Sequence, residues 1–281
     1  MSTCLSLVVA PWVRRPSPLL KTPANTSFPG LITAFQLAKF GHSKSIAIIE
    51  KGTKSSQDQY GRAITLYPRS SEILDQLGLA DELAQECFAC RNTVSYDKDG
   101  KEVEGRGWYF MENMKDTQWD FALVLRQKYQ EEIFRRRLRE EGVELEAPVE
   151  LVSIDVDEKM AQGGYKITAM TKHGVTGAEE TIVCKYLVGA DGGRSFVRRA
   201  LKVPFEGSTT EDKWVRIDGI IETDMPKSRV YGAIESPTHG NVLWAALDHG
   251  GTVSLILLSI SHSSSGPKSL KTCLGSRILS N

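Results

Sequence analysis

A helical pattern followed at once by a short β-branched run limits the possible folds of this chain more than any other feature. Apolar residues recur at helical spacing over residues 31–40, and Gly41 then supplies a C-terminal cap. The run at 45–49 predicts a buried strand, which ends at Glu50. Helix, tight turn, strand and terminal acid form the second half of a βαβ unit. We therefore expect an α/β fold with a Rossmann-like domain.

The apolar period changes to two in the second half of the chain. Runs at 149–156, 165–170 and 181–184, separated by glycine turns, predict an antiparallel β-meander. Residues 186–190 form a continuous apolar run, which is typical of a strand buried in a parallel sheet. Four more strand candidates lie between residues 214 and 258. These patterns predict a meander inserted into the Rossmann-like domain and the start of a second, sheet-based domain.

We expect four segments along the chain: an N-terminal arm of unexplained role (1–24), a nucleotide-binding domain (25–205), part of a second domain (206–260) and an irregular tail (261–281). The arm contains no acidic residue. Its four prolines prevent a long amphipathic helix. A targeting segment and a mis-spliced start both remain open for it. The Ser-rich end has too little apolar surface to offset its ordering entropy. We interpret the chain as truncated there.

Composition excludes several classes of protein. With 35 basic and 35 acidic residues the chain is formally neutral, so nucleic acid exerts no global attraction. No run of eighteen apolar residues exists, which excludes a membrane span. The five scattered cysteines form no disulfide framework and indicate a reducing compartment, so we expect a cytoplasmic protein.

Two local clusters have simple structural interpretations. Cys87 and Cys90 form a C-x-x-C, but no second ligand pair accompanies them, so we interpret them as small residues at a helix end and expect no metal site. The three arginines at 135–137 are flanked by glutamates on a helical pattern at 128–141. We interpret this run as a solvated, ion-paired helix face.

Glu50 ends a predicted strand 20 residues after Gly30. A carboxylate there can accept hydrogen bonds from both hydroxyls of an adenosine ribose. The glycine fingerprint that should accompany it is incomplete, since Asn25 and Ser27 stand where its first two glycines would be. Residues 5–10 can serve as the preceding strand only if 11–24 form an insertion in the phosphate loop.

The most specific signal is the stretch from Lys185 to Arg198, which reads KYLVGADGGRSFVR. A turn of small residues places Asp191 at the carboxyl end of a strand, where cofactors bind in open sheets. Ser195 can cap the next helix while Val197 packs beneath it. The alternative is a plain Asp-Gly turn, but the length of the pattern argues against it.

This stretch resembles the Asp-Gly motif of the class A FAD-dependent aromatic hydroxylases, the family of p-hydroxybenzoate hydroxylase and fungal phenol 2-monooxygenase. Segments 61–74 are similar to the family's flavin-contacting loop and helix, and Gln127 to the glutamine that contacts the flavin chain. Residues 214–226 and 240–244 resemble opening strands of its substrate domain. The resemblance covers roughly residues 29–250.

The resemblance implies FAD as cofactor, NAD(P)H as co-substrate, and O2 and a small phenolic compound as substrates. It implies that Arg62 balances the pyrophosphate charge, that Gln127 hydrogen-bonds the sugar-phosphate chain, and that Asp191 lies near the cofactor and helps to place NADPH. The cofactor-binding residues that we expect are Gly30, Glu50, Arg62, Gln127, Asp191 and Gly192. Self-association into a homo-oligomer stays open.

Departures from the family pattern leave alternatives. No Gly-Asp dipeptide exists in the chain, so the family's second flavin motif is missing, and Ile64 stands where phenol hydroxylases carry a substrate-activating Asp. No catalytic residue can therefore be named. We predict weak or absent flavin binding. A non-catalytic relative that holds no flavin is the second hypothesis, and a different flavoprotein oxidoreductase with two dinucleotide sites is the third.

Overall fold

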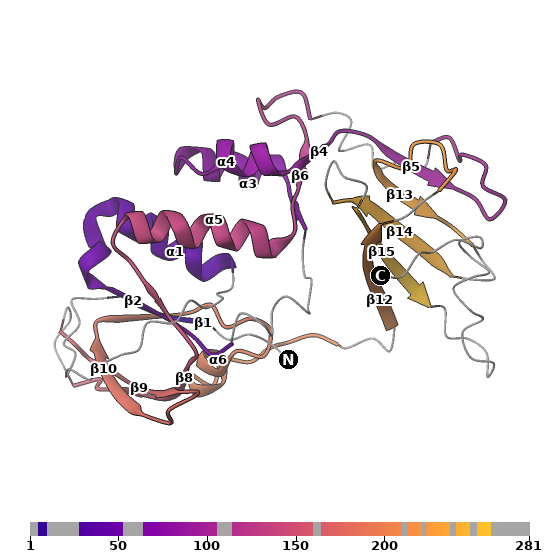
Figure 1. Ribbon diagram of the computed structural model, residues 1–281. Coiled ribbons are helices and arrows are strands. Elements are labelled where there is room, and N and C mark those ends of the chain that lie inside the picture. Colours follow the sequence, from indigo (N-terminus) through magenta and orange to yellow (C-terminus); the bar gives the residue numbers. More distant parts are fainter. Residues whose placement is uncertain are drawn as a thin grey trace, which may run out of the picture. The chain divides into compact units, whose positions relative to one another are not determined.

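The chain divides into two compact units, which are described separately. The computed structural model describes residues 5–9, 28–52, 64–105, 114–159, 164–208, 213–220, 223–236, 240–247 and 252–259 (Figure 1). The first unit comprises residues 1–63 and 127–206, and the second comprises 64–126 and 207–281. Residues 64–126, which lie inside the predicted nucleotide-binding segment, pack within the second unit.

The first unit is built on a four-stranded sheet. Its strands stand in the order β11 (Tyr186–Gly189), β1 (Leu5–Val9), β2 (Ile46–Glu50) and β7 (Leu145–Glu146). Strands β2 and β7 pair in parallel, whereas β1 is antiparallel to both of its neighbours. Strands β11, β2 and β7 therefore run in one direction, and their carboxyl ends lie at the same edge.

The direction of β1 differs from that of the first strand in a βαβ unit. Leu5 pairs with Glu50, and Val9 pairs with Ile46, so the amino end of β1 lies beside the carboxyl end of β2. In a βαβ unit the first strand is parallel to the second, and its carboxyl end leads into the phosphate loop. Residues 5–9 thus occupy the middle of the sheet but point away from the edge where that loop belongs.

Two helices cover one face of this sheet (Figure 1). Helix α1 (Phe28–Leu37) buries Leu31 and Phe35, and helix α5 (Gln127–Glu140) buries Phe134 and Leu138. The Phe28 ring meets the Phe134 ring edge-on at 5.0 Å, and Lys39 forms a 3.0 Å ion pair with Glu141. Phe28 begins α1 and lies beside the middle of α5, whereas Lys39 and Glu141 both lie near the ends of their helices, so α1 and α5 run in the same direction.

The turn between α1 and β2 follows the sequence closely. A π-helical turn (Ala38–His42) and a 3-10 turn (Ser43–Ser45) join the two elements. Gly41 adopts a φ of 87°, which only glycine accepts at little cost. The predicted helix, glycine cap and buried strand are confirmed, since all five residues of β2 are buried.

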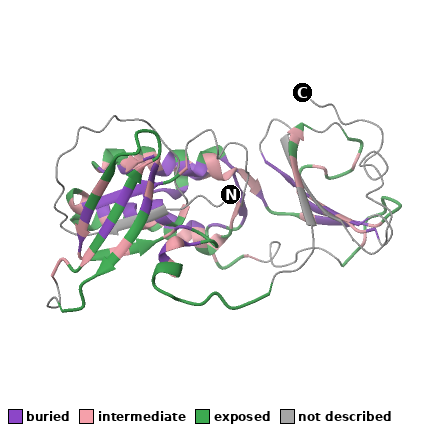
Figure 2. Cartoon of the chain, turned by 90° about the horizontal axis from the view of Figure 1, so that it is seen from below, coloured by how far each residue is buried: buried purple, intermediate pink, exposed green. Residues whose placement is uncertain are grey.

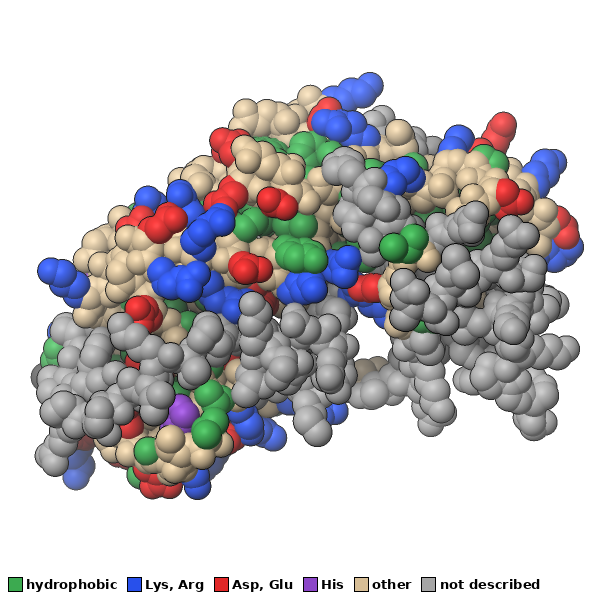
Figure 3. All heavy atoms as spheres, viewed as in Figure 1, with side chains coloured by type: hydrophobic (Ala, Val, Ile, Leu, Met, Phe, Trp, Pro, Cys, Tyr) green, Lys and Arg blue, Asp and Glu red, His purple; other side chains and the backbone are tan. Residues whose placement is uncertain are grey.

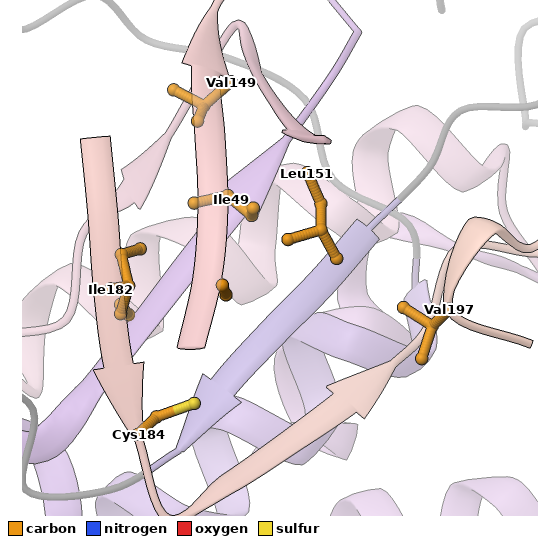
Figure 4. Packing of buried hydrophobic residues seen from close by; sticks show 8 residues of the cluster. Ile49, Val149, Leu151, Ile182, Cys184 and Val197 are labelled. Carbon is orange, nitrogen blue, oxygen red and sulfur yellow. The ribbon is translucent and has the colours of Figure 1, made fainter. Parts of the chain in front are cut away.

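The predicted meander covers the other face. Strands β8 (Val149–Val156), β9 (Ile167–His173) and β10 (Glu179–Cys184) pair antiparallel, and helix α6 (Phe196–Ala200) packs beside them. Inward residues alternate with more exposed ones along β9 and β10, whereas β8 loses this alternation at an irregularity between Leu151 and Ser153 (Figure 2). The core between meander and sheet contains Ile49, Val149, Leu151, Ile182, Cys184 and Val197 (Figure 4).

Strand β11 departs from the prediction of a strand buried in a parallel sheet. It stands at the end of the strand order, and among the described residues it pairs only with β1. Tyr186 keeps 64% of its surface exposed, and Val188 keeps 36%. The prediction was wrong because an unbroken apolar run does not encode whether a second neighbour lies alongside the strand.

The second unit contains two sheets and two helices. The small sheet has the order β3 (Thr65–Leu66), β6 (Ala122–Val124), β4 (Phe88–Cys90), and it accompanies helices α3 (Pro68–Gln76) and α4 (Ala80–Glu86). The large sheet has the order β12 (Lys213–Ile220), β15 (Thr252–Ser259), β14 (Asn241–Ala246), β13 (Tyr231–Ile234), β5 (Thr93–Tyr96).

The four late strands and helix α3 were predicted from the sequence and are confirmed. Strand β5 was not predicted, and it joins the large sheet in parallel with β13 from more than 130 positions earlier in the chain. Its Tyr96 ring stacks on Trp244 of β14, with the ring centroids 5.9 Å apart. Long-range pairing therefore brings part of segment 64–126 into the sheet that the sequence assigned to a second domain.

Candidate cofactor site

Two carboxylates of the first unit stand at the same edge of its sheet. Glu50 is the last residue of β2, and Asp191 follows β11 by two residues. Strand β1 lies between them, so the two strand ends are two inter-strand spacings apart, about 10 Å. In open α/β sheets ligands bind at this edge, outside the carboxyl ends of parallel strands.

Glu50 is fully buried, which is unusual for a carboxylate at a strand end. Its Oε1 accepts a hydrogen bond of 2.7 Å from the backbone N–H of Gly52. The bond folds the chain back over the side chain directly after β2. Glu50 is therefore held in a defined orientation and is not a solvated end of a strand.

Asp191 is also fully buried and caps helix α6. Its Oδ2 accepts hydrogen bonds from the backbone N–H groups of Phe196 at 2.5 Å and Val197 at 3.1 Å. Ser195 Oγ accepts a third from the N–H of Arg198 at 2.9 Å, as predicted. The other Asp191 oxygen, Oδ1, is buried and has no hydrogen-bond donor among the described residues.

The glycines of this motif have separate structural reasons. A Cβ atom on Gly189 would lie 2.7 Å from Cβ of Val197, so glycine is needed for α6 to approach β11. Gly192 has a φ of 74°, a conformation that glycine adopts readily. The predicted packing of Val197 under this turn is confirmed, since 6% of it is exposed.

A small cavity adjoins Asp191 on the side of the meander. Its volume is about 20 Å³, and its lining residues are Ile49, Lys51, Val149, Glu150, Leu151, Asp191 and Phe196. Lys51 and Glu150 form an ion pair across strands β2 and β8. A space of this size holds about one water molecule, so it is not itself a dinucleotide pocket.

Gln127 is the first residue of α5, and its side chain contacts the same helix. Its Nε2 donates a 2.6 Å hydrogen bond to Glu131 Oε1, one turn further on. Glu131 is 3% exposed and interacts through Oε2 with Arg135 Nη2 at 3.6 Å. Because α5 runs in the same direction as α1, Gln127 lies toward the edge that carries Glu50.

The interpretation of the arginine run as a solvated helix face needs correction. Arg136 is exposed, and Arg137 pairs with Glu140 at 3.1 Å, as expected. The side chain of Arg135, by contrast, is only 15% exposed, and its Nε donates to the Glu131 carbonyl at 3.1 Å. The residue type alone gives no signal for this burial. The expected ion pairing with Glu131 is confirmed, and only the degree of exposure differs.

The expected cofactor-binding residues are therefore partly accounted for. Gly30 is buried in the first turn of α1, Glu50 is the last residue of β2, and Asp191 and Gly192 follow β11, which is separated from β2 by β1. Gln127 stands at the start of the second helix of the same layer. Arg62, like Asn25 and Ser27, lies outside the described residues.

Ile64, which stands where a substrate-activating acid was sought, belongs to the second unit. It is 7% exposed and packs in a cluster with Cys90, Val124 and Leu247. Tyr231 packs against this cluster, its hydroxyl is hydrogen-bonded to Thr65, and burial raises the pKa of its phenol. The position is thus part of an apolar core.

The three described cysteines are free and buried. Cys87 and Cys90 are free and buried, and burial raises the pKa of Cys87 to about 11. Within the described ranges, no three His, Cys, Asp or Glu side chains come together as a metal site would require. Cys87 directly follows α4, as expected, but Cys90 is the last residue of strand β4, so the interpretation of the pair as residues at a helix end is confirmed for Cys87 and wrong for Cys90.

The residues present fit the adenosine part of FAD in two respects. Glu50 provides a buried carboxylate at the strand end where ribose hydroxyls bind in this fold class. Asp191 Oδ1 provides a buried acceptor that no described donor occupies. Both groups accept hydrogen bonds and suit hydroxyl donors.

Comparison with known proteins identifies the domain. Residues 27–251 match the family model described as "FAD binding domain". An FAD-dependent monooxygenase of Aspergillus terreus is 29% identical over 192 residues, which is 68% of this chain and 26% of that protein. A phenol 2-monooxygenase of Aspergillus fumigatus is 26% identical over 176 residues, 63% of this chain and 29% of that protein.

Solved structures agree on the fold. The crystal structure of p-nitrophenol 4-monooxygenase from Pseudomonas putida superposes with a TM-score of 0.68 at 21% identity, covering 84% of this chain and 56% of that one. The chain spans between a quarter and two fifths of the length of the first curated relatives.

No described helix is both long enough and apolar enough to cross a bilayer.

Proposed function

The chain belongs to the FAD-binding family of the class A aromatic hydroxylases, and on this premise we propose that it is the cofactor-binding part of an FAD- and NAD(P)H-dependent monooxygenase. The proposed substrate is a small phenolic ring, with O2 as co-substrate. The observation that carries this proposal is the pair of buried carboxylates, Glu50 and Asp191, at the carboxyl edge of one sheet.

Each residue of the edge has a proposed role. Glu50 accepts hydrogen bonds from the hydroxyls of the adenosine ribose, and its charge disfavours a 2′-phosphate there. Asp191 Oδ1 accepts a hydroxyl of the cofactor while Oδ2 holds the start of α6. Arg62 and Gln127 would contact the phosphates and the chain between them and the flavin. When bound, FAD supplies the reductive activation of O2 and the transfer of one oxygen atom to the ring.

We expect FAD to bind weakly. Asn25 and Ser27 replace the two glycines that let backbone N–H groups approach the pyrophosphate. The central strand β1 runs against β2, so its carboxyl end does not lead to the phosphate position. Both features weaken the binding of the FAD phosphates, whereas the part of the site that would bind the ribose is unaffected.

The second candidate function is that of a non-catalytic relative that holds no flavin stably. The reversed β1 and the apolar surroundings of Ile64 favour this candidate. It predicts the same fold and the same buried Glu50, but no flavin-dependent turnover.

Titration of the purified chain with FAD separates the two candidates. We expect partial quenching of flavin fluorescence, loss of flavin during gel filtration, and slow NADPH oxidation that rises when phenol is added. No change in flavin fluorescence at the highest FAD concentration would refute the first candidate and support the second. A stoichiometric flavin absorption band after purification would contradict our expectation of weak binding.

Expectations about partners follow from the same premise. Acidic and basic side chains are intermingled over the face seen in Figure 3, and the chain is formally neutral. This distribution lacks the single-sign surface that nucleic acid requires. A cytoplasmic location is proposed from the pattern of cysteines, and self-association stays a prediction that gel filtration tests.

A further inference from the structure

A surface segment of basic and apolar residues follows the turn after β11. Residues 192–205, here called the basic segment, contain no acidic residue, although the chain as a whole is formally neutral. Its cations are Arg194, Arg198, Arg199 and Lys202. Every residue from 199 to 208 is exposed, and so is Arg194. Positive charge is therefore concentrated in one surface segment of the first unit.

Most cations of the basic segment have no counter-charge in the described part of the chain. No described carboxylate forms an ion pair with Arg194, Arg199 or Lys202. Arg198 differs, because its Nη1 donates a 2.8 Å hydrogen bond to the carbonyl of Gly193. An external anion can therefore approach the other three side chains without displacing a carboxylate from them.

The turn that ends α6 holds one of these cations in an uncommon conformation. The N–H of Val203 donates to the Arg198 carbonyl at 3.0 Å, and the N–H of Lys202 donates to the carbonyl of Arg199 at the same distance. This pair of bonds is the Schellman ending of a helix, in which the position of Lys202 is usually glycine. Lys202 adopts a φ of 55°, which is strained for a residue with a Cβ, and such strain is concentrated at functional positions. Glycine would form this turn more easily, but it would not provide the positive charge.

Exposed apolar side chains stand between the cations. Leu201, Val203 and Phe205 occupy alternate positions and keep 55%, 53% and 72% of their surfaces exposed. The guanidinium of Arg198 lies 4.3 Å from the centroid of the Phe205 ring and so holds the ring in place. The residue at the position of Val203 in a Schellman ending often packs on the last turn of its helix, yet more than half of Val203 is exposed. The described part of the first unit therefore leaves these three side chains largely uncovered.

We propose that the basic segment is a docking surface for the anionic face of a phospholipid membrane. Its cations attract the negative head groups, and its exposed apolar side chains enter the boundary between head groups and acyl chains. Nucleic acid is a poorer match, because Leu201 and Val203 offer no aromatic face on which a base can stack. Docking is peripheral and reversible, since only a few side chains enter the bilayer. It goes beyond the proposed oxidation chemistry and does not depend on flavin binding.

Flotation with vesicles on a sucrose gradient tests the proposal on the full chain. Vesicles of phosphatidylcholine alone are compared with vesicles that also contain about 30 mol % phosphatidylserine. We expect the chain to float with the anionic vesicles only, and to float less as NaCl is raised to about 0.5 M, because salt screens the attraction. In Phe205→Trp, which keeps an aromatic ring beside Arg198, anionic vesicles should shift the added tryptophan fluorescence to shorter wavelength.

A matched pair of charge variants separates the segment from the net charge. Arg199→Gln combined with Lys202→Asn removes two cations, and asparagine tolerates the positive φ. We expect the affinity for anionic vesicles to fall about thirtyfold. Lys166→Gln combined with Lys172→Gln removes two exposed cations from the meander of the same unit and should stay within about twofold of the unaltered chain.

Two more variants test the apolar part and the turn. Leu201→Ser combined with Val203→Ser keeps every cation and should bind anionic vesicles at least about tenfold more weakly. Lys202→Gly removes one charge and relieves the strained turn, so it should bind about fivefold more weakly and unfold at a higher urea concentration. It replaces the double charge variant if circular dichroism shows that the latter is unfolded.

Several results would overturn the proposal. Failure of the unaltered chain to float with anionic vesicles is one, and equal losses in the two charge variants are another, because net charge alone would then be responsible. If Leu201→Ser with Val203→Ser floats like the unaltered chain, the apolar side chains do not enter a bilayer and the surface is not built for a membrane. If the chain does not float but binds a single-stranded oligonucleotide through the same two cations, the segment serves nucleic acid instead.

Discussion

Replacing Asp191 with alanine should remove the two hydrogen bonds that hold the start of helix α6, so that the helix opens more often. The Asp191 carboxylate accepts the N–H groups of Phe196 and Val197, at 2.5 and 3.1 Å. A hydrogen bond to a charged group contributes about 1.5–3 kcal/mol, so losing two costs about 3–6 kcal/mol. That is a large share of the 5–15 kcal/mol by which a domain is typically stable.

The effect should be local before it is global. Helix α6 has five residues, and Ser195 provides its remaining cap with a 2.9 Å bond to the N–H of Arg198. A loss of 3 kcal/mol corresponds to an increase in opening of about a hundredfold. Hydrogen exchange read by mass spectrometry should show this acceleration in the peptide that covers residues 195–201.

A matched control is available in the same unit. Asp155 on β8 is exposed, so Asp155→Ala removes a carboxylate without removing a buried bond, and exchange over 195–201 should be unchanged. Asp191→Asn keeps one acceptor oxygen of the same size and should give a smaller acceleration than alanine. If residues 195–201 exchange equally fast in Asp191→Ala and Asp155→Ala, Asp191 does not stabilise the start of α6.

Two other predictions concern packing and thiol chemistry. Gly232→Ala should destabilise the second unit by more than about 2 kcal/mol in urea unfolding, because its Cβ would lie 2.0 Å from the Trp244 ring, and an unchanged midpoint would contradict this. Cys87 and Cys184, whose pKa burial raises to about 11, should resist alkylation at pH 8 in the folded chain. Because the unfolded thiols lose their protons near pH 9 and the folded ones do not, stability should fall as the pH rises above 9. Rapid labelling of either cysteine at pH 8 would show that it is not buried as described.

Local patterns predicted most elements correctly. The helix that ends at Gly41, the buried strand β2 and the three strands of the meander each follow from a repeat of 3.6 or two residues. The same local reasoning placed Ser195 as a helix cap, and the structure confirms it. These features depend on residues within a few positions of one another, so the sequence shows them directly.

Predictions failed where distant segments decide the outcome. The apolar run 186–190 was expected to be a buried strand, but β11 stands at the sheet end with Tyr186 exposed. The arginine run was expected to be solvated, but Arg135 is buried against Glu131. A missing neighbour strand leaves no mark in the local pattern. The pairing of Arg135 with Glu131, one helical turn earlier, is local, but how far the pair is buried depends on what packs against α5.

The sequence by itself determined which segments form helices and strands, which side of each faces inward, and which acids follow strand ends. Only the tertiary structure decided that β1 runs against β2, that β5 joins the second sheet, and that the side chain of Arg135 is only 15% exposed beside Glu131. The physical reason is that backbone propensity and side-chain periodicity act over a few residues. The direction of a strand and the burial of a charged side chain, by contrast, are set by contacts between segments far apart in the chain.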